Sequence, residues 1–317
     1  MSVRDRWRTW SELWDQRESP RSLAIVRIGV ATVIACDLAE MARLGLVGAL
    51  WGPAEVGGIG DPLKTHPIPW LYSLLPATTQ TATVGWGVAI ACAILLAAGI
   101  LPRLSALTLL LLYAQFARVL SPADRGIDLL LRNALAILAL SDSGNAFSLR
   151  FLLGKSGGIP LQSIPSWPRH LLILQLAVMY FTAGIQKTAV AWTPMGGFSA
   201  LYIVLQDPAI AKLSFGWLRS IYPLTQLATA ATMVFEYTSV LIPLVYWYRY
   251  TRERPGWLRA QSNRTSPLRI WVLVGVFLHL GIALTMNLGI FPWAMLAIYP
   301  AFVHPDEWPR FGRPAAA

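Results

Sequence analysis

The run ATVGWGVAIACAILLAAGIL at residues 82–101 contains no charged side chain. It matches the roughly 20 apolar residues that an α-helix needs to cross a bilayer. Further apolar runs of comparable length lie at residues 23–42, 104–120, 171–191, 224–247 and 270–286. Two shorter runs, at 127–141 and 288–303, fit tilted spans or re-entrant segments, and Pro292 predicts a kink in the second.

The composition of the chain agrees with this interpretation of the runs. The chain has 317 residues, of which 55% are hydrophobic and only 13% charged, and its mean hydropathy is +0.51. A soluble domain typically carries about 25% charged residues, which argues against an ordinary soluble fold. The sequence therefore predicts an all-α polytopic membrane protein, a bundle of about eight transmembrane helices.

The basic residues indicate how the predicted spans are oriented. Lys and Arg outnumber Asp and Glu by 26 to 16, but they lie between long apolar runs, so the surplus does not predict nucleic-acid binding. Cytoplasmic loops are enriched in Lys and Arg. Eight spans with both termini in the cytoplasm leave few basic residues in the outer segments, namely Arg43, Lys64, Arg118, Arg125, Lys212 and Arg219. A seven-span layout, with the C-terminal tail outside, is the less favoured alternative.

The segments outside the spans differ in composition. Residues 1–21 are basic and Trp-rich without a cleavable signal pattern, so we expect them to stay in the cytoplasm. The other expected parts are the transmembrane domain 22–310, its outer loops 45–81 and 192–223, its basic cytoplasmic loop 249–269 and the tail 311–317. A basic cytoplasmic loop favours anionic lipid headgroups.

One lysine has the strongest case for chemistry. Ionisable residues inside spans are costly and by default mark function, and Lys187 lies near the outer end of the run 171–191. A lysine that loses its proton in an apolar site is a general base. The alternative is that the ammonium group of Lys187 reaches the outer surface, as long cationic side chains near span ends commonly do.

Other polar residues fall mostly in the outer half of the predicted spans, which suggests one polar cavity that opens outward. His279 is the second candidate catalytic residue, although a lone histidine is more often a hydrogen-bond partner between helices. The supporting residues are Asp37, Glu40, Asp128, Arg132, Gln186, Glu236 and Asn287. Asp128 and Arg132, at i and i+4, equally fit a structural ion pair. Glu236 equally fits a hydrogen bond to a neighbouring helix.

Motifs of other chemistries are missing from the sequence. It contains no Walker-type loop, no HExxH, no GxSxG and no cysteine pair with metal-binding spacing. Cys36 and Cys92 lie in separate apolar runs, as small buried side chains do. The four histidines are scattered along the chain, so we expect no metal site.

Two segments carry a resemblance to a known family. The stretch YFTAGIQKTAVAW from Tyr180 and the stretch HLGIALTMNLGIF from His279, followed by DEWPR at 306–310, resemble the vitamin K-dependent γ-glutamyl carboxylases. Their bacterial relatives are the HTTM (horizontally transferred transmembrane) domain proteins. The resemblance implies that Lys187 is the base that deprotonates a reduced quinone of the vitamin K type. It also implies that His279 hydrogen-bonds this cofactor, and that Tyr180 and Trp192 contact it.

The resemblance implies a role in the modification or maturation of a secreted peptide by a multi-pass protein of the plasma membrane. Its expected partners are membrane lipids, the peptide and a membrane or soluble protein. We expect the chain to lack the large C-terminal domain of the carboxylases, and the region of Asp128 stands where the resemblance implies a histidine. The alternative is a non-catalytic partner in the maturation, export or immunity of a peptide toxin, like the short B component of the sporulation-delaying peptide system. A transporter is disfavoured because the inner halves of the spans are nearly uncharged apart from Arg27.

Overall fold

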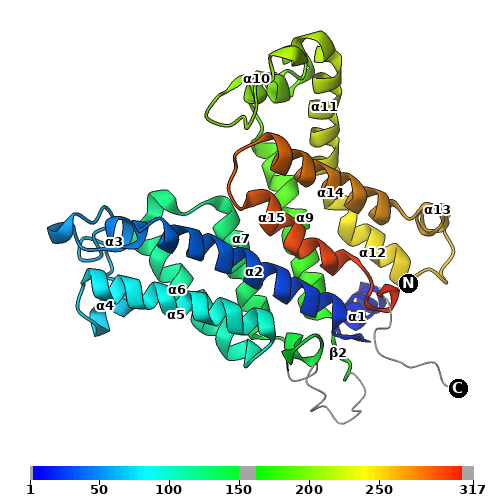
Figure 1. Ribbon diagram of the computed structural model, residues 1–317. Coiled ribbons are helices and arrows are strands. Elements are labelled where there is room, and N and C mark those ends of the chain that lie inside the picture. Colours follow the sequence, from blue (N-terminus) through cyan, green and yellow to red (C-terminus); the bar gives the residue numbers. More distant parts are fainter. Residues whose placement is uncertain (1–2, 150–161, 309–317) are drawn as a thin grey trace, which may run out of the picture. The chain divides into compact units, whose positions relative to one another are not determined.

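The structure, a computed structural model, describes residues 3–149 and 162–308, and its regular elements are almost all α-helices (Figure 1). The chain divides into two compact units, which we describe separately. The α2–α7 unit comprises Arg17–Pro168 and Val303–Ala317, and the α9–α15 unit comprises Met1–Gln16 and Arg169–Phe302. Several residues of the sequence interpretation lie outside the described residues, namely Arg150, Lys155, Pro309 and Arg310 of the DEWPR motif, and the tail 311–317.

Four helices form the centre of the α2–α7 unit and pack against one another in sequence order. They are α2 (Arg21–Arg43), α5 (Thr79–Ala98), α6 (Pro102–Val119) and α7 (Gly126–Ala139). Shorter elements are α3 (Leu46–Trp51), α4 (Trp70–Leu74) and the antiparallel strands β1 (Arg17–Glu18) and β2 (Ile164–Pro165). The Thr78 hydroxyl caps α5 by accepting a hydrogen bond from the Thr81 N–H at 3.1 Å, and Pro102 begins α6 where a missing N–H costs nothing.

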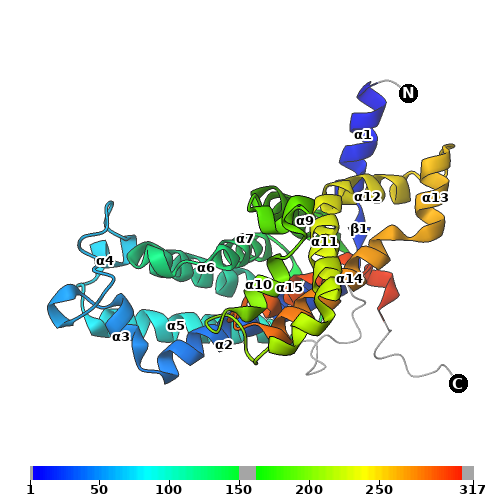
Figure 2. The same ribbon diagram turned by 90° about the horizontal axis from the view of Figure 1, so that it is seen from above.

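The α9–α15 unit also consists of helices, and the N-terminal helix packs within it. Its helices are α1 (Val3–Trp14), α9 (Trp167–Gln186), α10 (Ala200–Gln206), α11 (Tyr222–Thr238), α12 (Ile242–Tyr250), α13 (Trp257–Thr265), α14 (Pro267–Thr285) and α15 (Phe291–Ile298). The ring of Trp10 on α1 lies 5.6 Å from that of Trp247 on α12, and Trp14 contacts His170 on α9. Figure 2 shows α1 beside α12.

The apolar run 224–247 does not form the single helix that the sequence predicts. Helix α11 ends at Thr238, a 3₁₀ turn covers Ser239–Leu241, and α12 follows. Pro243 explains the interruption, because proline has no N–H to donate and its ring clashes with the carbonyl four residues earlier, that of Ser239. The Ser239 hydroxyl donates to the carbonyls of Glu236 and Ala177 at 2.7 and 2.9 Å, so the break is tied to helix α9.

The two segments that the sequence predicts as outer loops contain short helices. Loop 45–81 holds α3 and α4, and loop 192–223 holds α10 together with 3₁₀ turns at Pro194–Gly196 and Gly216–Ile221. Short helices of this kind cannot stand alone in water and depend on tertiary packing. Trp51 on α3 shows that packing, because its indole N–H donates to the Phe116 carbonyl of α6 at 3.0 Å.

A buried arginine ties together two parts of the α2–α7 unit. Arg27 on α2 has no exposed surface, and its guanidinium donates to the carbonyls of Ser143, Phe147 and Ala146 at 2.6, 2.7 and 3.3 Å. Three carbonyl dipoles thus take the place of a carboxylate partner for this charge. The arginine that the sequence places alone inside a span therefore ties α2 to the segment after α7.

Four helical segments among the described residues are long and apolar enough to cross a membrane: Arg21–Arg43, Thr79–Ala98, Gly216–Tyr250 and Pro267–Thr285. The shorter apolar segment Phe291–Phe302 falls in the predicted run 288–303. Helices α6, α7 and α9 form over the other predicted spans. The all-α polytopic class is confirmed, whereas the eight-span layout stays a prediction.

Candidate functional site

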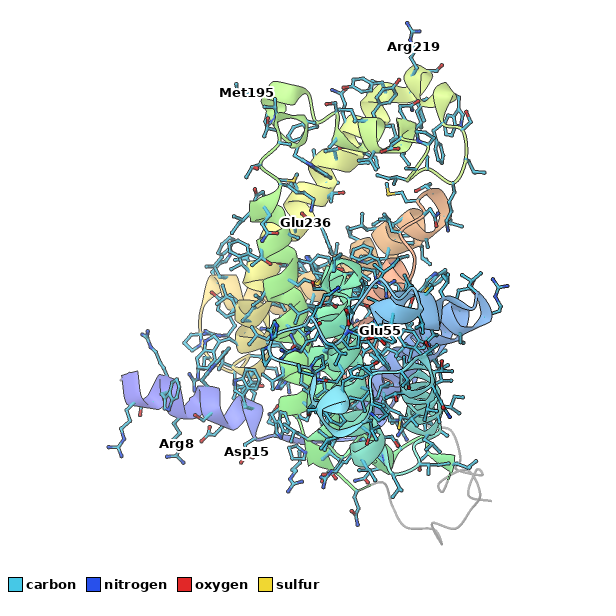
Figure 3. The ribbon with its side chains drawn as sticks, turned by 90° about the vertical axis from the view of Figure 1, so that its left-hand side faces the viewer. Arg8, Asp15, Glu55, Met195, Arg219 and Glu236 are labelled. Atoms are coloured by element: carbon cyan, nitrogen blue, oxygen red, sulfur yellow. The ribbon has the colours of Figure 1, made fainter. Side chains whose placement is uncertain are left out.

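Lys187 forms an ion pair with Glu236. The Nζ atom of Lys187 donates to both carboxylate oxygens of Glu236, at 2.6 and 2.7 Å. The Lys187 side chain is 21% exposed and the Glu236 side chain 8% exposed, so water screens the pair poorly. Nζ also lies 5.1 Å from the centre of the Trp192 ring, within the range of a cation–π interaction. Figure 3 labels Glu236 on α11 beside the green helix α9.

The end of α9 determines where Lys187 lies. The sequence places Lys187 inside the run 171–191, but α9 ends at Gln186 and Lys187 begins the connecting segment. Helices α9 and α11 approach closely at Gly184, because a Cβ atom built there would lie 3.2 Å from the Glu236 Cβ. The small residue three positions before Lys187 therefore lets the carboxylate approach the lysine.

A second polar group includes Tyr180 of α9. Tyr180 precedes Lys187 by seven positions, two helical turns, and its hydroxyl is hydrogen-bonded to His279 Nε2 on α14 and to the Tyr299 hydroxyl at 2.8 Å. Tyr180 is 3% exposed and His279 only 1% exposed. The other ring nitrogen of His279, Nδ1, is buried without a hydrogen-bond partner among the described residues. An unpaired buried polar atom costs about 1–3 kcal/mol and is suited to a ligand.

Aromatic rings surround this polar group. The rings of Phe235 and Trp271 stack with centres 4.4 Å apart and planes 15° apart. Both contact the Tyr180 ring edge-on, at 4.9 and 5.4 Å. The Trp271 indole N–H donates to the Phe235 carbonyl at 3.1 Å, which holds α14 against α11. The Tyr180 and His279 side chains thus lie in an apolar environment that strengthens each polar contact.

Gly275 on α14 makes room for Tyr299. A Cβ atom at position 275 would lie 2.0 Å from the Tyr299 hydroxyl oxygen, a distance that only displacement of the tyrosine relieves. Gly275→Ala should therefore break the Tyr180–Tyr299 hydrogen bond and destabilise the protein by about 1–3 kcal/mol. Thermal unfolding of the detergent-purified protein measures this effect. Gly281→Ala on the same helix is the matched control, since nothing lies within 4 Å of its Cβ; equal melting temperatures for the two variants would contradict the packing argument.

The α2–α7 unit contains a separate ionic cluster around Arg125. The Arg125 guanidinium donates to Asp37 at 2.6 Å and to Asp128 at 2.9 Å, and the Tyr113 hydroxyl donates to Asp128 at 2.6 Å. The predicted pairing of Asp128 with Arg132 is wrong, because Arg132 donates to both oxygens of Asp124, at 2.6 and 2.8 Å. Asp124 lies in the turn before α7, within reach of the Arg132 side chain. The ion-pair partner of Asp128 is Arg125.

A small cavity of about 200 Å³ adjoins this cluster. Asp37, Asp128 and Arg132 line it on one side, and the rings of Trp51 and Trp86 line it on another. The centres of these two indole rings lie 4.4 Å apart. The polar residues that the sequence assigns to one cavity therefore belong to two groups, one in each unit. Asp37 and Asp128 are joined by Arg125, which the sequence interpretation counts only as a charge of a predicted outer loop.

Three predicted supporting residues make no contact with either group. Glu40 pairs with Arg43 at the exposed end of α2, at 2.6 Å. Gln186 and Asn287 are exposed, and the Asn287 backbone N–H donates to the Ile210 carbonyl. Among the described residues, no group of three or more His, Cys, Asp or Glu side chains could hold a metal ion.

The long apolar helices and the buried acid–base groups define a polytopic α-helical membrane protein. A family model for the HTTM domain matches residues 16–308, nearly the whole chain. The chain therefore belongs to the HTTM domain family and is a membrane protein of this carboxylase-like group. No solved structure matches the chain.

Proposed function

We propose that this protein binds a reduced quinone beside Lys187 and uses it in the maturation of a secreted peptide at the plasma membrane. The observation that carries the proposal is the poorly exposed Lys187–Glu236 pair, whose lysine directly follows α9, the helix that carries Tyr180 of the Tyr180–His279 group. Carboxylic acid, amine, imidazole and phenol groups are those that move protons in enzymes. The family resemblance of the lysine segment supports the same residue as the base.

The residues around Tyr180 suit a quinone. A quinone ring is flat and apolar with oxygen atoms at its edge, so it needs aromatic walls and one or two hydrogen-bond partners. The Phe235–Trp271 stack offers such a wall, and the unpartnered Nδ1 of His279 offers a hydrogen bond to an oxygen. A reduced quinone would supply two electrons and acidic hydroxyl protons to the chemistry of the site.

Lys187 and Glu236 can hold a proton in two ways. In one, the Lys187 Nζ atom keeps it and donates to both carboxylate oxygens. In the other, a carboxylate oxygen carries the proton and Nζ is a neutral amine that accepts a proton from a bound acid. The net charge of the pair is zero in both arrangements, but a site of low dielectric constant favours the one in which both groups are neutral, because each buried charge loses its hydration. This exchange makes the lysine available as a base.

The test is whether quinone binding depends on this pair. The variant combining Lys187→Met with Glu236→Gln removes both charges together and so leaves no unpaired ion. We expect it to bind a short-chain vitamin K hydroquinone at least about tenfold more weakly, because charge-assisted hydrogen bonds contribute about 1.5–3 kcal/mol. Quenching of tryptophan fluorescence measures the affinity, and mass spectrometry of the purified protein detects retained quinones and peptides.

Lys64→Met is the matched control for this experiment. Its side chain is 79% exposed and lies in the α2–α7 unit, so the substitution should leave quinone affinity unchanged. Equal affinities for the wild type and the double variant would remove the basis for the proposed site.

The outer segment supports a second candidate function, a non-catalytic partner in peptide maturation, export or immunity. Met195, Leu213 and Trp217 are 92%, 66% and 58% exposed. Figure 3 shows Met195 and Arg219 at the tip of the α9–α15 unit. Exposed large apolar side chains mark surfaces that bind other proteins or lipid. Full peptide maturation in cells that carry the double variant at 187 and 236 would favour this function over the enzymatic one.

A further inference from the structure

An apolar cavity of about 770 Å³ opens between helices of the α9–α15 unit. Helices α11, α12 and α14 form its walls, with Val234, Leu241, Val245, Ile270 and Trp271 among the lining residues. Val234 and Ile270 are 62% and 59% exposed, so the cavity is a groove on the apolar surface and not part of the packed interior. A groove of this kind in a membrane helix bundle accommodates a hydrocarbon chain.

One end of the groove is polar and basic. Leu258 and Ser262 of α13 line it together with Tyr248 of α12, and the Arg259 guanidinium lies 5.3 Å from the centre of the Tyr248 ring. Arg259 lies on α13 between these two lining residues. Arg259 is held there by hydrogen bonds to the Pro255 carbonyl at 2.6 Å and the Thr251 hydroxyl at 3.0 Å. The cation therefore has a defined position beside Tyr248, a residue that lines the groove.

The chain around this end is strongly positive. Between positions 249 and 269 the only acidic residue is Glu253, against the arginines Arg249, Arg252, Arg254, Arg259, Arg264 and Arg269. Trp257, at the start of α13, is 76% exposed. Tryptophan with arginine at the end of a membrane helix is typical of the headgroup layer of a bilayer. Figure 2 shows α13 at the ends of α12 and α14, where such a layer would lie.

We propose that this groove binds one anionic phospholipid, with an acyl chain between α11, α12 and α14 and the phosphate group at Arg259. Charge complementarity identifies the occupant: an apolar groove alone takes any chain, but the basic end selects a lipid with net negative charge. The groove shares Phe235 and Trp271 with the aromatic wall of the proposed quinone site, but none of Lys187, Glu236, Tyr180 and His279 lines it. The lipid site therefore stands even if the protein binds no quinone.

Lipid retention by the full-length protein tests the proposal. The protein is reconstituted in vesicles that contain equal parts of phosphatidylglycerol and phosphatidylcholine with the same acyl chains. It is then extracted in detergent, and native mass spectrometry measures the mass of the protein with its retained lipids. We expect one phosphatidylglycerol to remain bound in preference to phosphatidylcholine. Arg259→Gln should lower that preference about fivefold, since one arginine at a lipid surface contributes about 1 kcal/mol. Val234→Trp should abolish retention by filling the groove.

Two matched variants separate specific from general effects. Arg219→Gln removes an exposed arginine of the outer segment, and Val240→Trp adds a tryptophan at a 50% exposed position that does not line the groove. Both should retain phosphatidylglycerol as the wild type does.

Two outcomes would overturn the proposal. One is equal retention of the two lipids, which means bulk surrounding lipid only. The other is that the bound ligand lost on the Val234→Trp substitution has the mass of a quinone and not of a phospholipid. A monodisperse elution profile shows that each variant is folded.

Discussion

Arg125→Leu is expected to destabilise the protein by about 3 kcal/mol, which lowers its apparent melting temperature in detergent by on the order of 5 °C. The arginine bridges two carboxylates, and Asp37 and Asp128 have side chains only 13% and 6% exposed. Without the guanidinium, Asp37 loses both of its ionic hydrogen bonds, and Asp128 keeps only the Tyr113 hydroxyl and a backbone N–H. The stability falls because the carboxylates of Asp37 and Asp128 would remain charged and poorly hydrated without a cationic partner.

The exposed pair of Arg43 and Glu40 provides the comparison. Their side chains are 68% and 49% exposed, so Arg43→Leu should cost less than about 1 kcal/mol. Arg125→Lys keeps the charge but cannot hold two carboxylates with a planar fork, so its effect should be intermediate. If the Arg125→Leu and Arg43→Leu variants have the same melting temperature, the Arg125 bridge does not stabilise the α2–α7 unit.

Lys187→Met alone is expected to destabilise the protein by about 3 kcal/mol, and adding Glu236→Gln should recover most of that loss. The single substitution leaves the Glu236 carboxylate, 8% exposed, without the donor of both of its hydrogen bonds. Glutamine at 236 carries no charge, so it has no need of a cation. Melting curves of the two single variants and the double variant give a coupling energy between the residues, expected at about 1–3 kcal/mol.

This cycle also separates stability from function. The double variant should be as well folded as the wild type and still fail to bind hydroquinone, because the proton-accepting amine is gone. Additive effects of the two substitutions would contradict the ion pair. A stable double variant that binds hydroquinone normally would contradict the role of Lys187 as a base but not the pairing.

The sequence predicts the helices well wherever burial alone decides them. The run 23–42 corresponds to α2 and the run 82–101 to α5, because an uninterrupted apolar stretch in a membrane has no alternative to helix. The run 224–247 lies within the helical segment Gly216–Tyr250, but hydropathy does not indicate the 3₁₀ turn at Ser239–Leu241, which Pro243 explains by removing a hydrogen bond. The run 171–191 differs at its end, because α9 ends at Gln186 and only a 3₁₀ turn at Val190–Trp192 follows.

The site is predicted less completely, because its contacts join residues far apart in the chain. Lys187 and Glu236 are both found as ionisable residues in apolar runs, yet nothing in their spacing indicates that they pair. Arg125 reaches Asp37 across 88 positions, and its spacing of three from Asp128 is the one local signal that could have found it. Tyr299 carries no signal, because its position beside Tyr180 depends on the space that Gly275 leaves.

The place of Lys187 beyond the last turn of α9 has a mechanical consequence. Glu236 lies within helix α11, whereas Lys187 lies just past the end of α9, where its backbone N–H donates to the Gly184 carbonyl at 3.2 Å. Rotation about the bonds of the flexible lysine side chain can move the amine away from the carboxylate without unwinding a helix. A molecule that entered between the two groups would separate them at the cost of the ion pair and of the contacts of Nζ with the Trp192 ring and the Ala183 carbonyl, with both helices left intact.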